Sequence, residues 1–151
     1  MAGEADFVVQ SPDKKVQLIV EAKSRSDATQ SWAAQLRRNL VAHSAIPAGP
    51  YFLLALPDRF YLWRDGRAAA TVPPDFVIDG RAELAPYMSA LKVPSQDLSE
   101  QGFELLVQTW LQDLVTTNLE NPGYVRVRDW LKDSGLSDSI RHGTVKSQVS
   151  P

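Results

Sequence analysis

The first part of the chain alternates apolar and polar residues in the manner of two short strands. Residues 6–10 and 16–23 are rich in β-branched and aromatic side chains, and residues 11–14 between them contain Pro12 at the second position of a turn. The sequence therefore predicts an antiparallel hairpin. The alternation along 16–23 turns four apolar side chains to one face of the strand, and it leaves Glu21 and Lys23 together on the other face.

The position of Asp6 relative to this pair depends on the length of the hairpin loop. If Gln10 opposes Lys15, then Asp6 opposes Ile19 and lies diagonal to Glu21. If the loop is two residues longer, Asp6 opposes Glu21 directly. Both registers place Asp6 on the face of Glu21, whereas a slip of one residue would turn it to the opposite face.

A helix is predicted over about residues 26–44, with Ser26 or Asp27 as its cap. Gln35 lies at the edge of its apolar stripe, which is formed by Trp32, Ala33, Leu36 and Leu40. The Pro- and Gly-containing segment 46–50 ends the helix.

Three or four further strands are expected after this helix. The near-continuous apolar run 51–56 is typical of a central strand that is covered on both faces. A second strand covers 60–63, the pair Asp65-Gly66 indicates a hairpin turn, the segment 68–72 returns antiparallel, and 76–78 forms a short edge strand.

The remainder of the chain is predicted to be helical. A helix covers 81–92, with Pro86 delaying its start, and the segment 94–97 ends it. Apolar residues recur at helical spacing over 103–115, and a shorter helix covers 124–132. We therefore expect one α/β domain with a mixed sheet flanked by helices: residues 1–146, consisting of a core (5–80) and a helical extension (81–146), followed by a disordered tail (147–151).

Composition and charge restrict the function classes. The chain has 151 residues, 44% of them hydrophobic, and its formal net charge is −2, which argues against a polybasic nucleic-acid binder but allows a locally basic cleft. It has no cysteine, so disulfides, zinc–thiolate sites and thiol catalysis are excluded. The N-terminal residues do not resemble a signal peptide and no apolar run is long enough to span a bilayer, so a cytoplasmic protein without membrane contact is expected.

The expected hairpin carries a pattern of charged residues that suits metal-dependent chemistry. Mg²⁺ or Mn²⁺ takes oxygen ligands, and Asp6 and Glu21 on adjacent strands can supply two carboxylates, with the backbone carbonyl of Ala22 as a third oxygen. Lys23 would hold or deprotonate an attacking water and stabilise phosphate charge, and Gln35 would orient Lys23, the water or the DNA backbone.

These residues resemble the core of the PD-(D/E)xK nuclease superfamily. Ala5 to Val9, Leu18 to Lys23, Gln35 and Tyr51 to Leu54 occur in the order found in the nuclease domain of type I restriction motor subunits. The resemblance covers roughly the first 65 residues. It implies a restriction endonuclease-like fold and a DNA endonuclease, a hydrolase that depends on magnesium, with Asp6, Glu21, Lys23 and Gln35 as its catalytic residues.

The sequence also departs from this family. Members have a helix and a strand before the acidic strand, alanine replaces the proline that names the motif, and Asn39 stands where a tyrosine usually follows the glutamine. The C-terminal helices, a second copy of the chain or a partner subunit could supply the missing layer. An inactive nuclease-like module that binds protein or DNA is therefore an alternative, and a chance motif in a structural α/β protein is another.

Several basic residues could contact DNA phosphates. They are Lys14, Lys15, Arg25, Arg37 and Arg38, of which the last two are expected to point away from the apolar stripe of their helix. The alternative for all of them is a solvated, charged surface.

Overall fold

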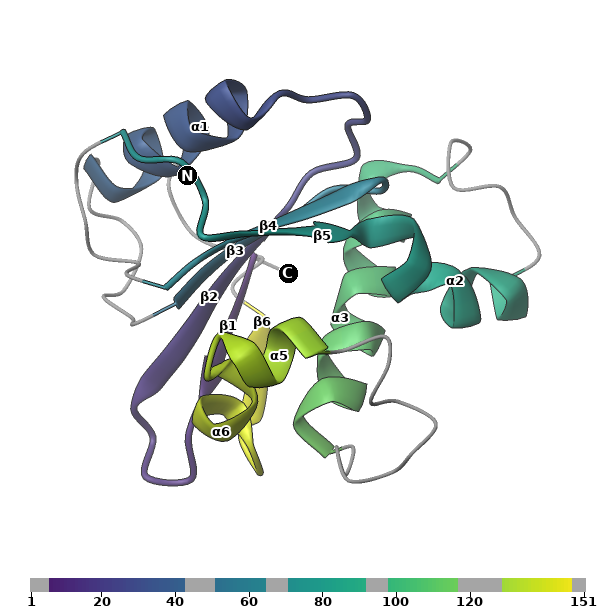
Figure 1. The fold of residues 1–151 in the computed structure, drawn as a ribbon. Coiled ribbons are helices and arrows are strands. Elements are labelled where there is room, and N and C mark those ends of the chain that lie inside the picture. Colours follow the sequence, from purple (N-terminus) through teal and green to yellow (C-terminus); the bar gives the residue numbers. More distant parts are fainter. Residues whose placement is uncertain (1–5, 43–50, 65–70, 92–97, 117–128, 148–151) are drawn as a thin grey trace.

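A computed structural model describes residues 6–42, 51–64, 71–91, 98–116 and 129–147, and Figure 1 shows their arrangement. Six strands form one sheet in the order β5-β4-β3-β2-β1-β6. The β2 and β3 strands are parallel and every other neighbouring pair is antiparallel, so the sheet is mixed, as predicted. The strands are β1 (Phe7–Gln10), β2 (Val16–Ala22), β3 (Tyr51–Ala55), β4 (Arg59–Trp63), β5 (Phe76–Asp79) and β6 (Thr144–Ser147).

Helices cover both faces of the sheet (Figure 1). One helix, α1 (Gln30–Ala42), packs on the face that carries Val8, Ile19 and Phe52. The opposite face packs against the C-terminal helices α2 (Gly80–Leu91), α3 (Glu100–Thr116), α5 (Asp129–Asp133) and α6 (Leu136–Ile140). Each face therefore has its own apolar core, which explains why β3 is apolar along its whole length.

The hairpin of β1 and β2 has the register of the longer loop. Phe7 pairs with Val20, and continuing this register outward places Asp6 opposite Glu21. The register shifts between Val9 and Gln10, so that Gln10 pairs with Val16. The loop contains Lys14 with φ of 68°, a conformation typical of tight turns.

Two predictions for α1 were wrong. Its cap is Thr29, whose hydroxyl accepts the backbone N–H of Trp32 at 3.0 Å, and not Ser26 or Asp27. Arg37 does not point away from the core: it is 0% exposed, and its guanidinium lies 5.5 Å from the ring centre of Trp63. The predicted end of this helix near residue 44 and the break at 46–50 lie outside the described residues.

The edge of the sheet beyond β4 also differs from the expectation. The strand that returns antiparallel to β4 is β5, which was predicted only as a short edge strand, while residues 71–75 are not in a strand. Residues 65–70, with the predicted turn, are outside the described part. Pro86 lies inside α2, which begins at Gly80 and is not delayed. A β-carbon at Gly80 would lie 2.9 Å from the backbone nitrogen of Arg59, so any other residue at this point would force backbone atoms to shift.

The C-terminal third is less uniformly helical than predicted. The α3 helix buries the apolar residues of the predicted stripe, including Phe103 and Trp110. The end of the chain adds a short helix, α6, and the strand β6, neither of which was expected. The β6 strand pairs antiparallel with β1, with Phe7 opposite Ser147, so it covers the open edge of the predicted hairpin. Residues 94–97, 124–128 and 148–151, on which other predictions fall, are outside the described part.

In the described ranges, no helix has both the length and the apolar character that crossing a membrane requires.

Candidate active site

Asp6 lies at a bend immediately before β1, where its side chain replaces a backbone partner of the sheet. Its Oδ2 accepts the backbone N–H of Ala22 at 2.8 Å. Partial burial raises the pKa of Asp6, and the nearby charge of Glu100 adds to this, although the Ala22 N–H and the ammonium of Lys23 act in the opposite direction. The hydrogen bond fixes the carboxyl group at the end of β2, next to Glu21.

Glu21 is a buried carboxyl group with one unsatisfied oxygen. Its residue is 4% exposed, because it points to the face that α1 covers together with Ile19. Oε1 lies 3.2 Å from Nζ of Lys23, whereas Oε2 is buried and accepts no hydrogen bond within the described part of the chain. Burial and the neighbouring charge of Asp6 raise the pKa of Glu21 to about 7, despite the opposing effect of Lys23. An unpaired buried oxygen of this kind is rare in folded proteins and marks a position that a ligand could fill.

Lys23 follows the last residue of β2 and is held by the sheet. Its backbone N–H donates to the carbonyl of Ala55 at 3.0 Å, while its side chain is 41% exposed. Burial opposes the charge of Lys23, but the carboxylates of Glu21, Asp6 and Glu100 outweigh this effect and raise its pKa. Lys23 therefore remains an ammonium that is both anchored by Glu21 and accessible from solvent.

Two further carboxyl groups, on α3, belong to this cluster and were not predicted. Glu100 Oε2 accepts the backbone N–H of Ser24 at 2.9 Å, which ties the helix to the chain just beyond β2. Partial burial raises the pKa of Glu104, and the charges of Asp6 and Glu100 add to the effect. The spacing of Glu100 and Glu104 shows that they share a helix face. Nothing in the local sequence, however, indicates which strand end that face approaches.

The oxygen atoms of this cluster can be compared with the ligands that a divalent cation prefers. In the described ranges, no set of three or more histidine, cysteine, aspartate or glutamate side chains is arranged as metal ligands. The expected ligand set needs only two carboxylates and a backbone oxygen. Because the N–H of Ala22 points to Asp6 and both polar groups of a strand residue point to the same side, the Ala22 carbonyl also faces that side. With the unpartnered oxygen of Glu21, the donors fit a hard cation whose other positions water would fill.

Gln35 is not brought to this cluster. It is exposed on α1, and within the described part of the chain no hydrogen bond joins it to Asp6, Glu21 or Lys23. The buried residues of α1 are Ala33, Ala34 and Arg37, and the partly buried Trp32, Leu36 and Leu40 pack against the same core.

The predicted DNA-contacting residues lie at different places on the molecule. Lys14 and Lys15 are exposed in the hairpin loop, at the opposite end of β2 from Glu21. Glu21 is six positions after Lys15, a distance of roughly 20 Å at about 3.3 Å per residue of extended chain. Arg25 is exposed and stacks over Trp32 at 4.4 Å from the ring centre, and Arg38 is exposed on α1. Of this set, Arg25 is the one that follows the trio directly in the chain.

Comparisons of this chain with protein-family models, with curated proteins and with solved structures gave no match.

Proposed function

We propose that this chain is a divalent-metal-dependent phosphodiesterase that cleaves DNA, with Asp6, Glu21 and Lys23 as its central residues. The observation that carries the proposal is the pairing of two carboxyl groups at one strand end, one of which has a buried oxygen that none of the described residues satisfies with a hydrogen bond. Burial raises the pKa of both carboxyl groups, and the charge of Asp6 raises that of Glu21 further, so a bound cation would relieve the unfavourable negative charge at this site.

Asp6, Glu21 and the Ala22 carbonyl would hold the cation. When bound, Mg²⁺ or Mn²⁺ would supply Lewis-acid activation of a water and neutralise charge on the phosphate. Lys23 has two roles in this scheme: its ammonium, held by Glu21 at 3.2 Å, positions the water and stabilises the charge of the reacting phosphate. Because the Lys23 side chain is partly exposed, it can reach a substrate that approaches from solvent.

The arrangement of strands supports the resemblance to PD-(D/E)xK nucleases. An antiparallel hairpin carries Asp6 and then Glu21-Ala22-Lys23, and the next strand, β3, lies parallel to the second strand of that hairpin. Family members have a helix and a strand before the acidic strand. In this chain, a helix and a strand from the C-terminal part would take their place. Here β6 lies beside β1, and α3 brings Glu100 and Glu104 to the cluster.

The second candidate function is a nuclease-like module that binds DNA or protein without cleaving. Two observations favour it: Gln35 is exposed and makes no hydrogen bond to the trio, and no group of three or more histidine, cysteine, aspartate or glutamate side chains among the described residues could hold a metal ion. Its distinguishing property would be the absence of metal binding at Asp6 and Glu21.

The decisive experiment combines cleavage with metal binding. Purified protein is incubated with supercoiled plasmid and with linear DNA in Mg²⁺ or Mn²⁺, beside Lys23→Ala and the control Lys132→Ala, an exposed lysine on α5. We expect cleavage by the unaltered protein and by Lys132→Ala, and none by Lys23→Ala. Cleavage that Lys23→Ala retains would refute the assignment. Calorimetric titration should show that the unaltered protein binds Mn²⁺ and that Glu21→Gln does not. If the unaltered protein neither cleaves DNA nor binds Mn²⁺, the second candidate is favoured.

A further inference from the structure

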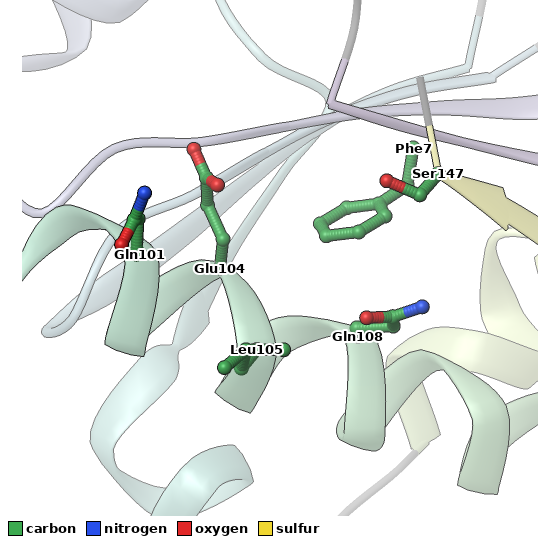
Figure 2. A pocket seen from close by; sticks show the side chains of 6 residues that line it. All are labelled: Phe7, Gln101, Glu104, Leu105, Gln108 and Ser147. Carbon is green, nitrogen blue, oxygen red and sulfur yellow. The ribbon is translucent and has the colours of Figure 1, made fainter. Parts of the chain in front are cut away.

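A pocket of about 340 Å³ lies beside the cluster, between α3 and the strands β1 and β6. Figure 2 shows four of its residues on successive turns of α3, facing Phe7 of β1 and Ser147 of β6. The four are Gln101, Glu104, Leu105 and Gln108. The walls therefore combine an apolar surface with amide and carboxyl groups, which is the usual composition of a small-ligand site.

The pocket shares Glu104 with the candidate active site. Glu104 lies one helical turn after Glu100, which accepts the backbone N–H of Ser24 at 2.9 Å, next to Lys23. The charges of Asp6 and Lys23 also reach Glu104. A substrate whose reacting group lies at Lys23 would thus place the next part of its structure in this pocket.

The groups in the pocket suit a nucleobase. Leu105 is 64% exposed, an unusual position for a large apolar side chain, and it offers an apolar surface for the face of a planar ring, while Phe7, which is only 2% exposed, contributes to the floor of the pocket. In the described part of the chain, the side-chain amides of Gln101 and Gln108 have no hydrogen-bond partner, and Glu104 can accept from an exocyclic amino group. The volume is near the lower end of the roughly 300–1,000 Å³ typical of ligand pockets, enough for one nucleotide and too small for a duplex.

We infer that this pocket binds one unpaired base of a DNA strand, next to the phosphate that is cleaved. The inference rests on the proposed phosphodiesterase function, since that function places a phosphate at Lys23. Bases in an intact duplex are stacked and paired, so a base can enter the pocket only from a single strand, a frayed end or a flap. The substrate class is accordingly DNA with unpaired nucleotides, and a fully paired duplex binds without using the pocket.

The test compares binding of a single-stranded oligonucleotide with binding of its fully paired duplex. Fluorescence anisotropy is measured with Ca²⁺ present, and a gel checks that the strand stays intact. Gln101 and Gln108 are both replaced by alanine, and Gln112→Ala is the matched control, because it is an exposed glutamine of the same helix that does not line the pocket. We expect the double variant to bind the single strand about tenfold more weakly, since two hydrogen bonds are lost. Duplex binding should change less than about twofold, and Gln112→Ala should behave as the unaltered protein.

Three results would overturn the inference: no single-strand binding by the unaltered protein, no effect of the double variant, or an equal loss on single strand and duplex. The cleavage experiment is independent of these results. If the unaltered protein does not cleave DNA but the double variant selectively loses single-strand binding, base binding in the pocket is supported and the proposed cleavage is refuted. If cleavage depends on Lys23 but binding does not depend on the two glutamines, the cleavage is supported and base binding in the pocket is refuted.

Discussion

Replacing Glu21 by glutamine should make the metal-free protein more stable at neutral pH. The carboxyl group is 4% exposed, and burial together with the charge of Asp6 raises its pKa from 4.5 to about 7. Since the folded state binds this proton more tightly than the unfolded state, the free energy of unfolding falls as the pH rises from about 4.5 to about 7. A shift of this size corresponds to about 3 kcal/mol at about 1.4 kcal/mol per pH unit.

The amide of Glu21→Gln is neutral at every pH and therefore avoids this loss. The variant gives up the ion pair with Lys23, which is 41% exposed, at a cost of up to about 1 kcal/mol. The net gain above pH 7 is about 2 kcal/mol, which corresponds to a rise in Tm of about 4–8 °C for a domain of this size. Below pH 4.5 the variant should be equally or slightly less stable than the unaltered protein.

The assay is thermal and urea unfolding followed by circular dichroism at several pH values from 4 to 8, with EDTA present. Asp133→Asn is the control, because it removes an exposed carboxylate on α5. The informative quantity is the difference in unfolding free energy between the variant and the unaltered protein, which cancels the contributions of the other carboxyl groups. A difference that does not depend on pH would refute the reasoning. Adding Mn²⁺ at pH 8 should stabilise the unaltered protein but not Glu21→Gln.

Two further predictions use matched pairs of residues. Arg37→Ala should lower the free energy of unfolding by about 2–4 kcal/mol, because it empties a buried site beside Trp63. In urea unfolding, the control Arg38→Ala, at the exposed neighbouring position, should change it by less than about 0.5 kcal/mol, and equal effects of the two variants would contradict the burial of Arg37. Gly80→Ala should cost about 1–3 kcal/mol because its new β-carbon would press on fixed backbone atoms, while Gly102→Ala, whose nearest neighbours are side-chain atoms at 3.3 Å or more, should change stability by less than about 1 kcal/mol. A Gly80→Ala protein with an unchanged melting temperature would disprove the close approach.

The hairpin and its charged residues could be predicted because their information is local. The period-two alternation of 16–23 determines which side chains share a face, so Glu21 and Lys23 had to end together. The loop length was open at the level of sequence, because both lengths satisfy the same alternation. The shift of register between Val9 and Gln10 selects the arrangement in which Asp6 stands opposite Glu21.

The features that were missed depend on contacts between distant parts of the chain. The β6 strand has four residues with only Val145 buried, too short a pattern to be recognised without its partner β1. Glu100 and Glu104 look like ordinary polar positions of an amphipathic helix until the end of β2 is placed beside them. Arg37 was expected in solvent because its helical position lies away from the apolar stripe, but its long side chain packs on the Trp63 ring inside the core.

The pairing of β1 with β6 also has a consequence for how the protein folds. The two strands are separated by nearly the whole described chain, so their pairing carries the largest loop-closure entropy in the sheet. The β2–β3–β4 centre involves much shorter separations and can form first, leaving β1 with one unpaired side. We therefore expect amide hydrogen exchange to be faster along β1 and β6 than in β3. An opening limited to that edge would release the backbone that holds Asp6, and it would disable the carboxylate pair while the rest of the core stays folded.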